Sequence, residues 1–115
     1  MSWDQVRALL IANILVGVNL DTRNSNGRIV LLANQDRFRI RIGQSNFIDI
    51  SIESLEFIYN DIIRDNEGWF NKGVAQRHLE RQIRSHGCFV HVIGIIFCIS
   101  GVLERVDNRN YRLIN

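Results

Sequence analysis

The first apolar stretch of the chain has the spacing of a helix. Apolar side chains recur three or four positions apart over residues 3–16, which places them on one face of an α-helix. Ser2 and Gln5 form a capping-box pair, because each side chain can bond the backbone N–H of the other residue. We therefore predict a helix over residues 3–16, followed by a short strand or extended connection over residues 18–22.

Residues 37–42 read RFRIRI, an unbroken alternation of arginine and apolar side chains. This alternation is typical of a strand with one buried and one exposed face. The Asn-Ser-Asn-Gly sequence at residues 24–27 predicts a tight turn before it, and residues 28–32 and 47–50 are shorter candidate strands. Together they predict a small antiparallel meander, with three side chains of the central strand in the core: Phe38, Ile40 and Ile42.

The clearest helical pattern lies over residues 52–65, where apolar side chains recur at i, i+3, i+4, i+7 and i+8. Ser51 is a suitable N-cap, and Glu53 stands in the first turn, where the helix dipole favours a negative charge. Residues 69–70 are expected to be a short extended link. Asn71 then caps a second helix that ends near residue 84.

Residues 88–100 are apolar on all sides and rich in β-branched side chains, so propensity alone allows a strand. A helix is favoured because the segment is long for a strand and because Gly101 stands where a left-handed C-terminal cap belongs. A strand, a turn and a second strand are predicted directly after it, over residues 102–114.

From Ser51 onward, the predicted order is helix, extended link, helix, tight turn, buried helix and β-hairpin. This order resembles that of winged-helix domains, which are helix-turn-helix units with a β wing. The resemblance rests on the capped helix, on HLERQIRSHGCFVHVIG at residues 78–94 and on SGVLERVDNRNYRLI at residues 100–114. The predicted fold class is therefore α+β in a single domain. An N-terminal helix and a small antiparallel β-meander (residues 1–50) precede a winged-helix-like three-helix unit with a C-terminal β-hairpin (residues 51–115).

The composition is that of a globular chain: 115 residues, 46% hydrophobic and 23% charged. Two cysteines are too few for a disulfide framework. The apolar run over residues 8–18 falls short of the roughly 20 residues that span a bilayer, and it lacks the features of a signal peptide. We therefore expect a cytoplasmic protein with no membrane association.

The net charge of +2 hides an uneven distribution. Thirteen of the 14 basic residues are arginine, and a segment of net charge −5 over residues 49–67 separates segments of +3 and +4. Arginine is suited to bidentate contacts with phosphate and guanine. The winged-helix resemblance implies duplex DNA as the partner, with the third helix in the major groove and the wing against phosphate or the minor groove. The candidate nucleic-acid-binding residues lie in a stripe on the helix that Asn71 caps, in the turn and helix that follow it, and in the hairpin. They are Arg77, Arg81, Arg84, His86, His91, Arg105, Arg109 and Arg112.

Two features of this interface remain open in the sequence. The presumed third helix offers only His91 and Ser100 to a base edge, whereas base readout usually uses Arg, Lys, Asn or Gln. A second basic row on the predicted central strand either pairs with Asp49 or Asp36 or makes a second nucleic-acid contact. This row comprises Arg37, Arg39 and Arg41.

No catalytic constellation is found. Gly-rich phosphate loops and a G-x-S-x-G elbow are missing, and the single lysine, Lys72, does not fit an acid–acid–lysine nuclease pattern. Four residues of metal-ligating type lie close in sequence without a C-x₂-C pair, so core thiols are favoured over a structural zinc. These four are His86, Cys88, His91 and Cys98. We expect a protein that is not an enzyme and has no cofactor or metal.

The leading hypothesis is a homodimeric duplex DNA-binding protein of winged-helix type, such as a transcriptional or mobile-element regulator. The alternative is a protein–protein interaction or oligomerisation module that does not bind nucleic acid and uses the acidic helix and the apolar side chains of Trp3, Trp69 and Phe70. The folded surface discriminates between them. Arginines that converge away from the acids favour DNA, and arginines that interleave with Asp61 and Asp65 favour the interaction module.

Overall fold

The computed structural model describes residues 1–21, 23 and 26–114, and these contain four helices and two small antiparallel sheets. The helices are α1 (Trp3–Asn13), α2 (Ile52–Arg64), α3 (Lys72–Ser85) and α4 (Cys88–Ile99). The first sheet has the strand order β1-β2-β3 and contains β1 (Val30–Ala33), β2 (Arg37–Ile42) and β3 (Asn46–Ser51). The second has the order β4-β6-β5 and contains β4 (Trp69–Phe70), β5 (Leu103–Arg105) and β6 (Tyr111–Leu113). The α+β class and the predicted sequence of elements are confirmed.

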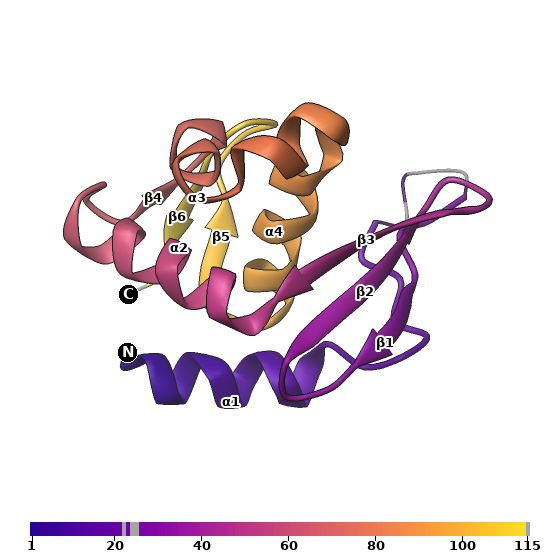
Figure 1. Ribbon diagram of the computed structural model, residues 1–115. Coiled ribbons are helices and arrows are strands. Elements are labelled where there is room, and N and C mark those ends of the chain that lie inside the picture. The colour runs from indigo at the N-terminus through magenta and orange to yellow at the C-terminus, as the bar shows by residue number, and fades with distance from the viewer. Residues whose placement is uncertain (22, 24–25, 115) are drawn as a thin grey trace.

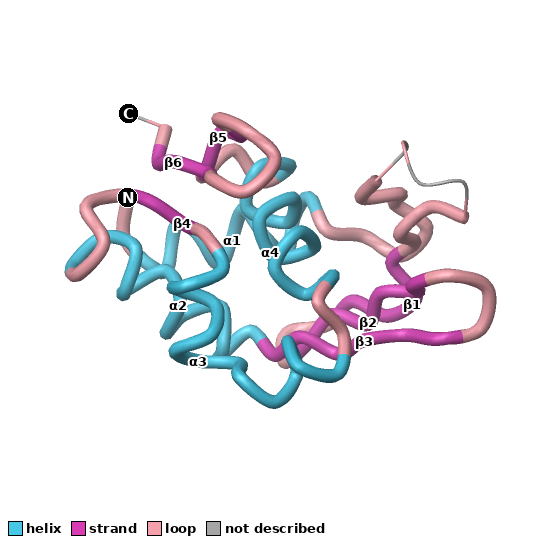
Figure 2. The backbone as a smooth tube through the Cα atoms, turned by 90° about the horizontal axis from the view of Figure 1, so that it is seen from above, coloured by secondary structure: helices cyan, strands magenta, loops and turns pink. Residues whose placement is uncertain are grey.

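The elements surround α4, as Figure 1 shows. Helix α1 runs along the bottom, the meander lies to the right, and α2, α3 and the C-terminal hairpin lie around the upper left. Seen from above in Figure 2, α4 stands between α3 and the hairpin. The buried apolar side chains of all these elements form one cluster, so the helix whose sequence is apolar on every side is the one at the centre.

The meander follows the predicted alternation. Strand β2 pairs with β3 in a regular register from Arg37↔Ser51 to Ile42↔Asn46, and the apolar side chains of β2 are all buried, as predicted. Residues 18–22 are predicted as a short strand or an extended connection, and the described residues among them form one isolated bridge, Asn19↔Ile29. Thr22 and the turn positions Asn24 and Ser25 lie outside the described residues.

Helix α1 begins with the predicted capping box between Ser2 and Gln5 but ends at Asn13, three residues earlier than predicted. The chain leaves the helix to join the meander: the N–H of Gly17, at φ +92°, donates to the carbonyl of Val30. Apolar spacing continues beyond the helix because Ile14 is buried in its C-cap position. The pattern alone therefore places the helix end too late.

Helix α3 begins at its predicted Asn71 cap, but it is kinked. Leu79 has φ −134° and ψ 42°, outside the helical range. The kink interrupts the spacing that predicted one arginine stripe, with Arg77 before it and Arg81 and Arg84 after it. The continuous stripe is therefore wrong.

Residues 88–99 are helical. The sequence favoured a helix here but also allowed a strand, and the structure has the helix. Gly101 follows at φ +78°, the predicted left-handed cap position. The predicted extended link over residues 69–70 is strand β4, whose residues pair with β6 as Trp69↔Arg112 and Phe70↔Tyr111. This pairing ties the start of α3 to the hairpin.

Candidate functional site

Several of the predicted contact arginines are engaged by carboxylates. Each pair has an N–O distance of 2.9 Å or less, and the side chains are 32–76% exposed except for that of one acid, Asp61. The pairs are Arg39–Asp49, Arg77–Asp61, Arg84–Glu80 and Arg112–Glu104. Their net contribution to an anion-binding surface is reduced because each positive charge is compensated nearby.

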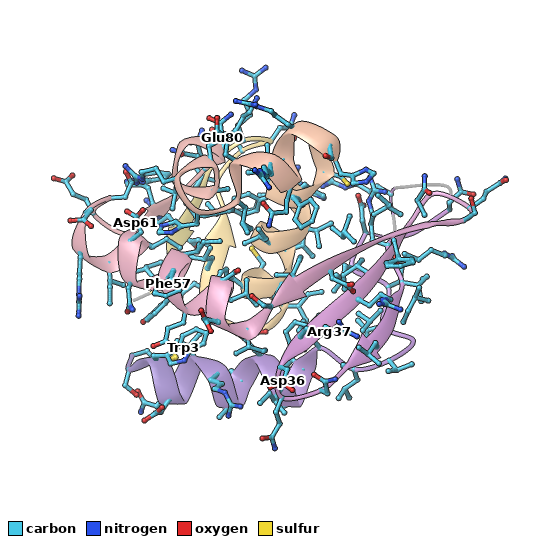
Figure 3. The ribbon with its side chains drawn as sticks, in the orientation of Figure 1. Trp3, Asp36, Arg37, Phe57, Asp61 and Glu80 are labelled. Carbon is cyan, nitrogen blue, oxygen red and sulfur yellow. The ribbon has the colours of Figure 1, made fainter. Side chains whose placement is uncertain are left out.

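Asp61 joins α2 to α3 and is only 8% exposed. Its two oxygens accept from Nε and Nη2 of Arg77, both at 2.9 Å, and Oδ2 also lies 2.9 Å from Nε2 of His78. The ring of His78 stacks on that of Phe57, with centroids 6.4 Å apart. Figure 3 shows Asp61 and Phe57 along α2 and Glu80 on α3 above them. Arg77 is therefore part of the packing between two helices. An arginine that pairs with Asp61 in this way favours the protein–protein interaction module over DNA binding, as far as this residue is concerned.

The hairpin uses two of its arginines for its own structure. Arg105 donates to the carbonyl of Asp107 and to Oδ1 of Asn108, and Arg112 lies beside Glu104 with its guanidinium 5.9 Å from the ring centroid of Trp69. Arg112 stands in strand β6 of the hairpin, away from its tip. The exposed residue Arg109 is the arginine left at the tip.

The turn that carries Arg109 is held by Asp107. The Asp107 carboxylate accepts from the backbone N–H of Arg109 at 2.8 Å and of Asn110 at 3.0 Å. These bonds favour the charged carboxylate, and the N–H of Arg109 is the main cause that holds the pKa of Asp107 below its ordinary value. The tip thus has a fixed backbone from which Arg109 projects.

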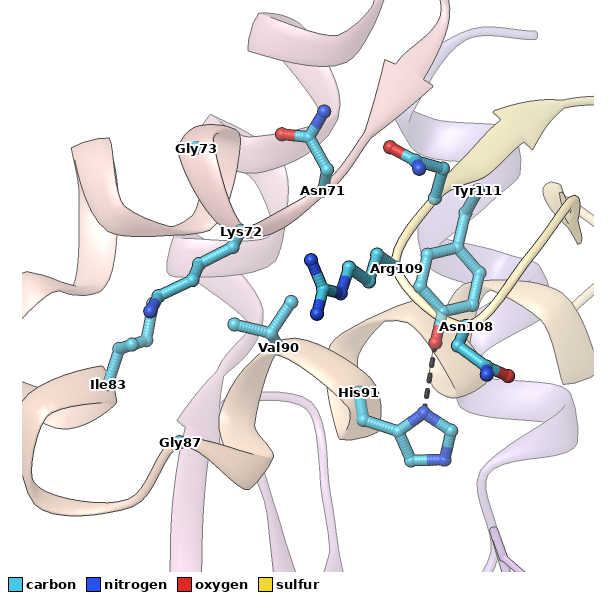
Figure 4. A pocket seen from close by; sticks show the side chains of 11 residues that line it. Asn71, Lys72, Gly73, Ile83, Gly87, Val90, His91, Asn108, Arg109 and Tyr111 are labelled. Carbon is cyan, nitrogen blue, oxygen red and sulfur yellow. Dashed lines mark hydrogen bonds between the residues drawn. The ribbon is translucent and has the colours of Figure 1, made fainter.

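A cavity of about 710 Å³ lies between the start of α3, the start of α4 and the hairpin tip. Figure 4 shows Arg109 reaching from the hairpin into this cavity, with Lys72 along the α3 side and His91 on the α4 side. None of the lining residues is acidic. They are Asn71, Lys72, Gly73, Ile83, Gly87, Val90, His91, Asn108, Arg109, Asn110 and Tyr111.

His91 is held on both sides of its ring. Nδ1 lies 3.0 Å from the Tyr111 hydroxyl, and Nε2 lies 3.3 Å from Oδ2 of Asp21. In the neutral imidazole, Nε2–H donates to the carboxylate and Nδ1 accepts from the phenol, because a carboxylate can only accept. Burial raises the pKa of Tyr111 to about 12, so its hydroxyl keeps the proton that this bond requires. His91 thus joins the loop after α1 to strand β6.

The other candidates on α4 and near it do not line the cavity. Ser100 is 3% exposed, and its hydroxyl donates to the carbonyl of Ile96. His86 lines a second, shallower depression with Arg81 and Phe47. Burial raises the pKa of the Cys88 thiol and raises that of Cys98 to about 11, as expected of core thiols. Within residues 1–21, 23 and 26–114, no group of three or more acids, histidines and cysteines is placed to hold a metal ion.

The second basic row is partly paired, as one of its two interpretations predicted. Arg39 bonds Asp49, which is the main cause of the lowered pKa of that carboxyl, and its guanidinium lies 4.2 Å from the ring centroid of Phe47. Arg41 donates to the carbonyl of Asn26. Arg37 is exposed, and Figure 3 shows it beside Asp36 on the meander.

The cavity contains residues that sequence reasoning did not select. In the sequence, Lys72 bears only on lysine-dependent chemistry, and Asn71 is indicated only as a helix cap. No local signal joins them to Asn108 and Asn110, because the pairing of β4 with β6 brings these segments together. The hairpin tip, which carries Arg109 between two asparagines, was the available hint, because binding residues are disproportionately found on loops.

No family model matches this chain, and the comparisons with curated proteins and with solved structures found no match. In the part of the chain that the structure describes, no helix has the length and apolar character needed to cross a membrane.

Proposed function

We propose that this chain binds duplex DNA through the face formed by α3, the start of α4 and the hairpin tip. The observation that carries the proposal is the cavity between these elements, which is lined by Lys72, Arg109 and His91 and by no acidic residue. The order of three helices and a hairpin resembles a winged-helix unit, in which the same elements face the duplex. Duplex DNA as the partner requires an intracellular site of action.

The charges of this face support a phosphate ligand. In the described residues, Lys72 and Arg109, which line the cavity, form no ion pair with a carboxylate, unlike Arg77, Arg84 and Arg112. Lysine and arginine side chains that neutralise phosphates release condensed counterions, and this release supplies most of the affinity of non-specific DNA binding. A chain of modest net charge can therefore bind DNA if its free cations share one face.

Fluorescence anisotropy of a labelled duplex at several salt concentrations tests the proposal. We expect binding that weakens steeply with salt, and we expect Arg109→Ala to lower the slope of log K against log salt by roughly 1 on removal of one phosphate contact. Arg64→Ala is the matched control, because it removes the same charge from an exposed residue at the end of α2. Absence of binding at low salt would contradict the proposal, as would equal effects of the two variants.

Self-association is a second candidate, favoured by the edge of the meander. Strand β3 is the last strand of its sheet, and its outer edge makes no backbone ladder with another described segment. Phe47 on this strand is 48% exposed, and an uncovered edge strand is a template for pairing with a second copy. The side chains named for the alternative hypothesis offer less: Phe70 is fully buried, and Trp3 packs against Tyr59.

Light scattering after size exclusion measures this association. A dimer of the wild-type chain should become a monomer on Phe47→Glu, which places a charge beside the pairing edge. Leu31→Glu on β1 is the control, since Leu31 is similarly exposed. A monomeric wild-type chain, or a dimer that survives Phe47→Glu, would remove this candidate.

A further inference from the structure

We infer that the proposed DNA contact is made with the sugar–phosphate backbone and does not read base sequence. The inference rests on the proposed function and specifies its ligand as duplex DNA of any sequence. It follows from the state of the imidazole and amide side chains on this face and from the small number of cations that remain free there.

Helix α4 cannot supply base contacts along its length. It stands between α3 and the hairpin (Figure 2), and six of its residues, including Phe89, Val92 and Ile93, are buried. Its partly exposed residues other than His91 are apolar or thiols: Cys88, Val90, Ile95, Cys98 and Ile99. Major-groove readout depends on amide, guanidinium or ammonium groups that match the donors and acceptors of the bases. This helix carries none.

His91 is the polar residue of α4, and its ring nitrogens are already engaged. One faces the Tyr111 hydroxyl and the other faces Asp21, at 3.0 and 3.3 Å. Contact with a base through Nδ1 would leave the buried hydroxyl of Tyr111 without its partner, which costs about 1–3 kcal/mol, and contact through Nε2 would displace Asp21. His91 therefore serves to position the hairpin.

The amide side chains around the cavity are also engaged. Asn71 accepts from the N–H of Val74 as the cap of α3, Asn110 donates to both oxygens of Asp107, and Asn108 accepts from Arg105. Gln82 is exposed, but it lines the depression on the β3 side of α3 and not the cavity. Because recognition of adenine uses both the oxygen and the nitrogen of an amide, bonds of these groups within the protein compete with that contact.

The side chains that remain at the cavity are the cations Lys72 and Arg109, on two separate parts of the face. Lys72 opens α3, and Arg109 stands at the hairpin tip, whereas Arg81 lines the depression on the β3 side together with Gln82. Contacts of this kind with phosphates fix the orientation of a protein on the duplex without carrying sequence information. Two such contacts predict a slope of log K against log salt of about −2, since each contributes about 0.9.

The inference is tested by measuring dissociation constants for duplexes of one length and different sequence at one salt concentration. Selection from a random duplex library accompanies this measurement. We expect dissociation constants within tenfold of one another and no enriched motif. A preference of tenfold or more, or an enriched motif, would overturn the inference, because sequence-specific proteins prefer their sites by roughly 10³-fold or more. Absence of binding to every duplex is a different result, and it would remove the proposed function itself.

Two variants separate backbone contact from readout on the same duplexes. Arg109→Ala should weaken binding to all of them by the same factor, whereas a base-reading arginine would lose affinity for some sequences only. Gln82→Ala is the matched amide variant and should change no dissociation constant by more than twofold. Sequence-dependent effects of either variant would contradict the inference.

Discussion

The ring of Tyr111 lies directly against the backbone of Gly94. A Cβ at Gly94 would stand 2.4 Å from Cζ of the tyrosine, so the absence of a side chain in the middle of α4 lets strand β6 approach the helix. This contact places the Tyr111 hydroxyl beside His91 and the hairpin tip beside the cavity. One glycine in a helix of otherwise bulky residues thereby sets the position of the proposed DNA-binding face.

Gly94→Ala should destabilise the protein, because the added methyl group overlaps a fully buried ring. Overpacking of this kind costs typically 1–3 kcal/mol or more. Thermal or urea unfolding measures the effect. Gly87→Ala is the control, since a Cβ there meets nothing within 4 Å, and it should change stability by less than about 0.5 kcal/mol. Equal stability of the two variants would show that the ring does not occupy this position.

Asp61→Ala should destabilise the packing of α3 on α2. The substitution removes the buried acceptor of Arg77 and His78, but the Arg77 side chain is 51% exposed and can regain water. We therefore expect a loss of about 1–3 kcal/mol, below the 3–5 kcal/mol typical when one member of a fully buried pair is removed. Glu80→Ala is the matched control, because its pair with Arg84 is exposed and should contribute less than about 0.5 kcal/mol.

The hairpin turn should be sensitive to acid through Asp107. The backbone bonds to this carboxylate lower its pKa in the folded protein below the ordinary 3.8. A lowered pKa means that the contribution to stability is present above pH 3.8 and is lost as the pH falls through the folded pKa. An NMR titration should show the Asp107 carboxyl and the Arg109 amide changing together below pH 3.8. A midpoint at or above 3.8 would contradict the bonding described here.

Alkaline pH should weaken the fold through Tyr111. Burial raises its pKa from 10 to about 12, so the folded chain keeps a proton that the unfolded chain releases. The stabilisation is complete below pH 10 and is lost as the pH rises through about 12. Tyr111→Phe removes this dependence but also the bond to His91, at a cost of about 1 kcal/mol at neutral pH. Unfolding measured at pH 7 and pH 11 should show a smaller difference for the variant than for the wild type.

The sequence by itself determined the local elements. Capping residues at Ser2, Ser51 and Asn71 and the alternation over residues 37–42 predicted where helices and strands begin, because these signals act between neighbours in the chain. They also predicted which side chains of β2 are buried, and the pair of Arg39 with Asp49 is one of the alternatives that the sequence left open for the arginines of this strand. The resemblance of the element order to a winged-helix unit remains a prediction about function.

Tertiary structure alone decided which charges remain free. The kink at Leu79 and the burial of Asp61 turned Arg77 into a structural residue, although its spacing placed it in a stripe with Arg81. The pairing of Phe70 with Tyr111 brought the start of α3 to the hairpin tip and created the cavity between Lys72 and Arg109. Neither result can be predicted from a local sequence pattern, because a pairing between distant segments depends on how all the elements pack into one core.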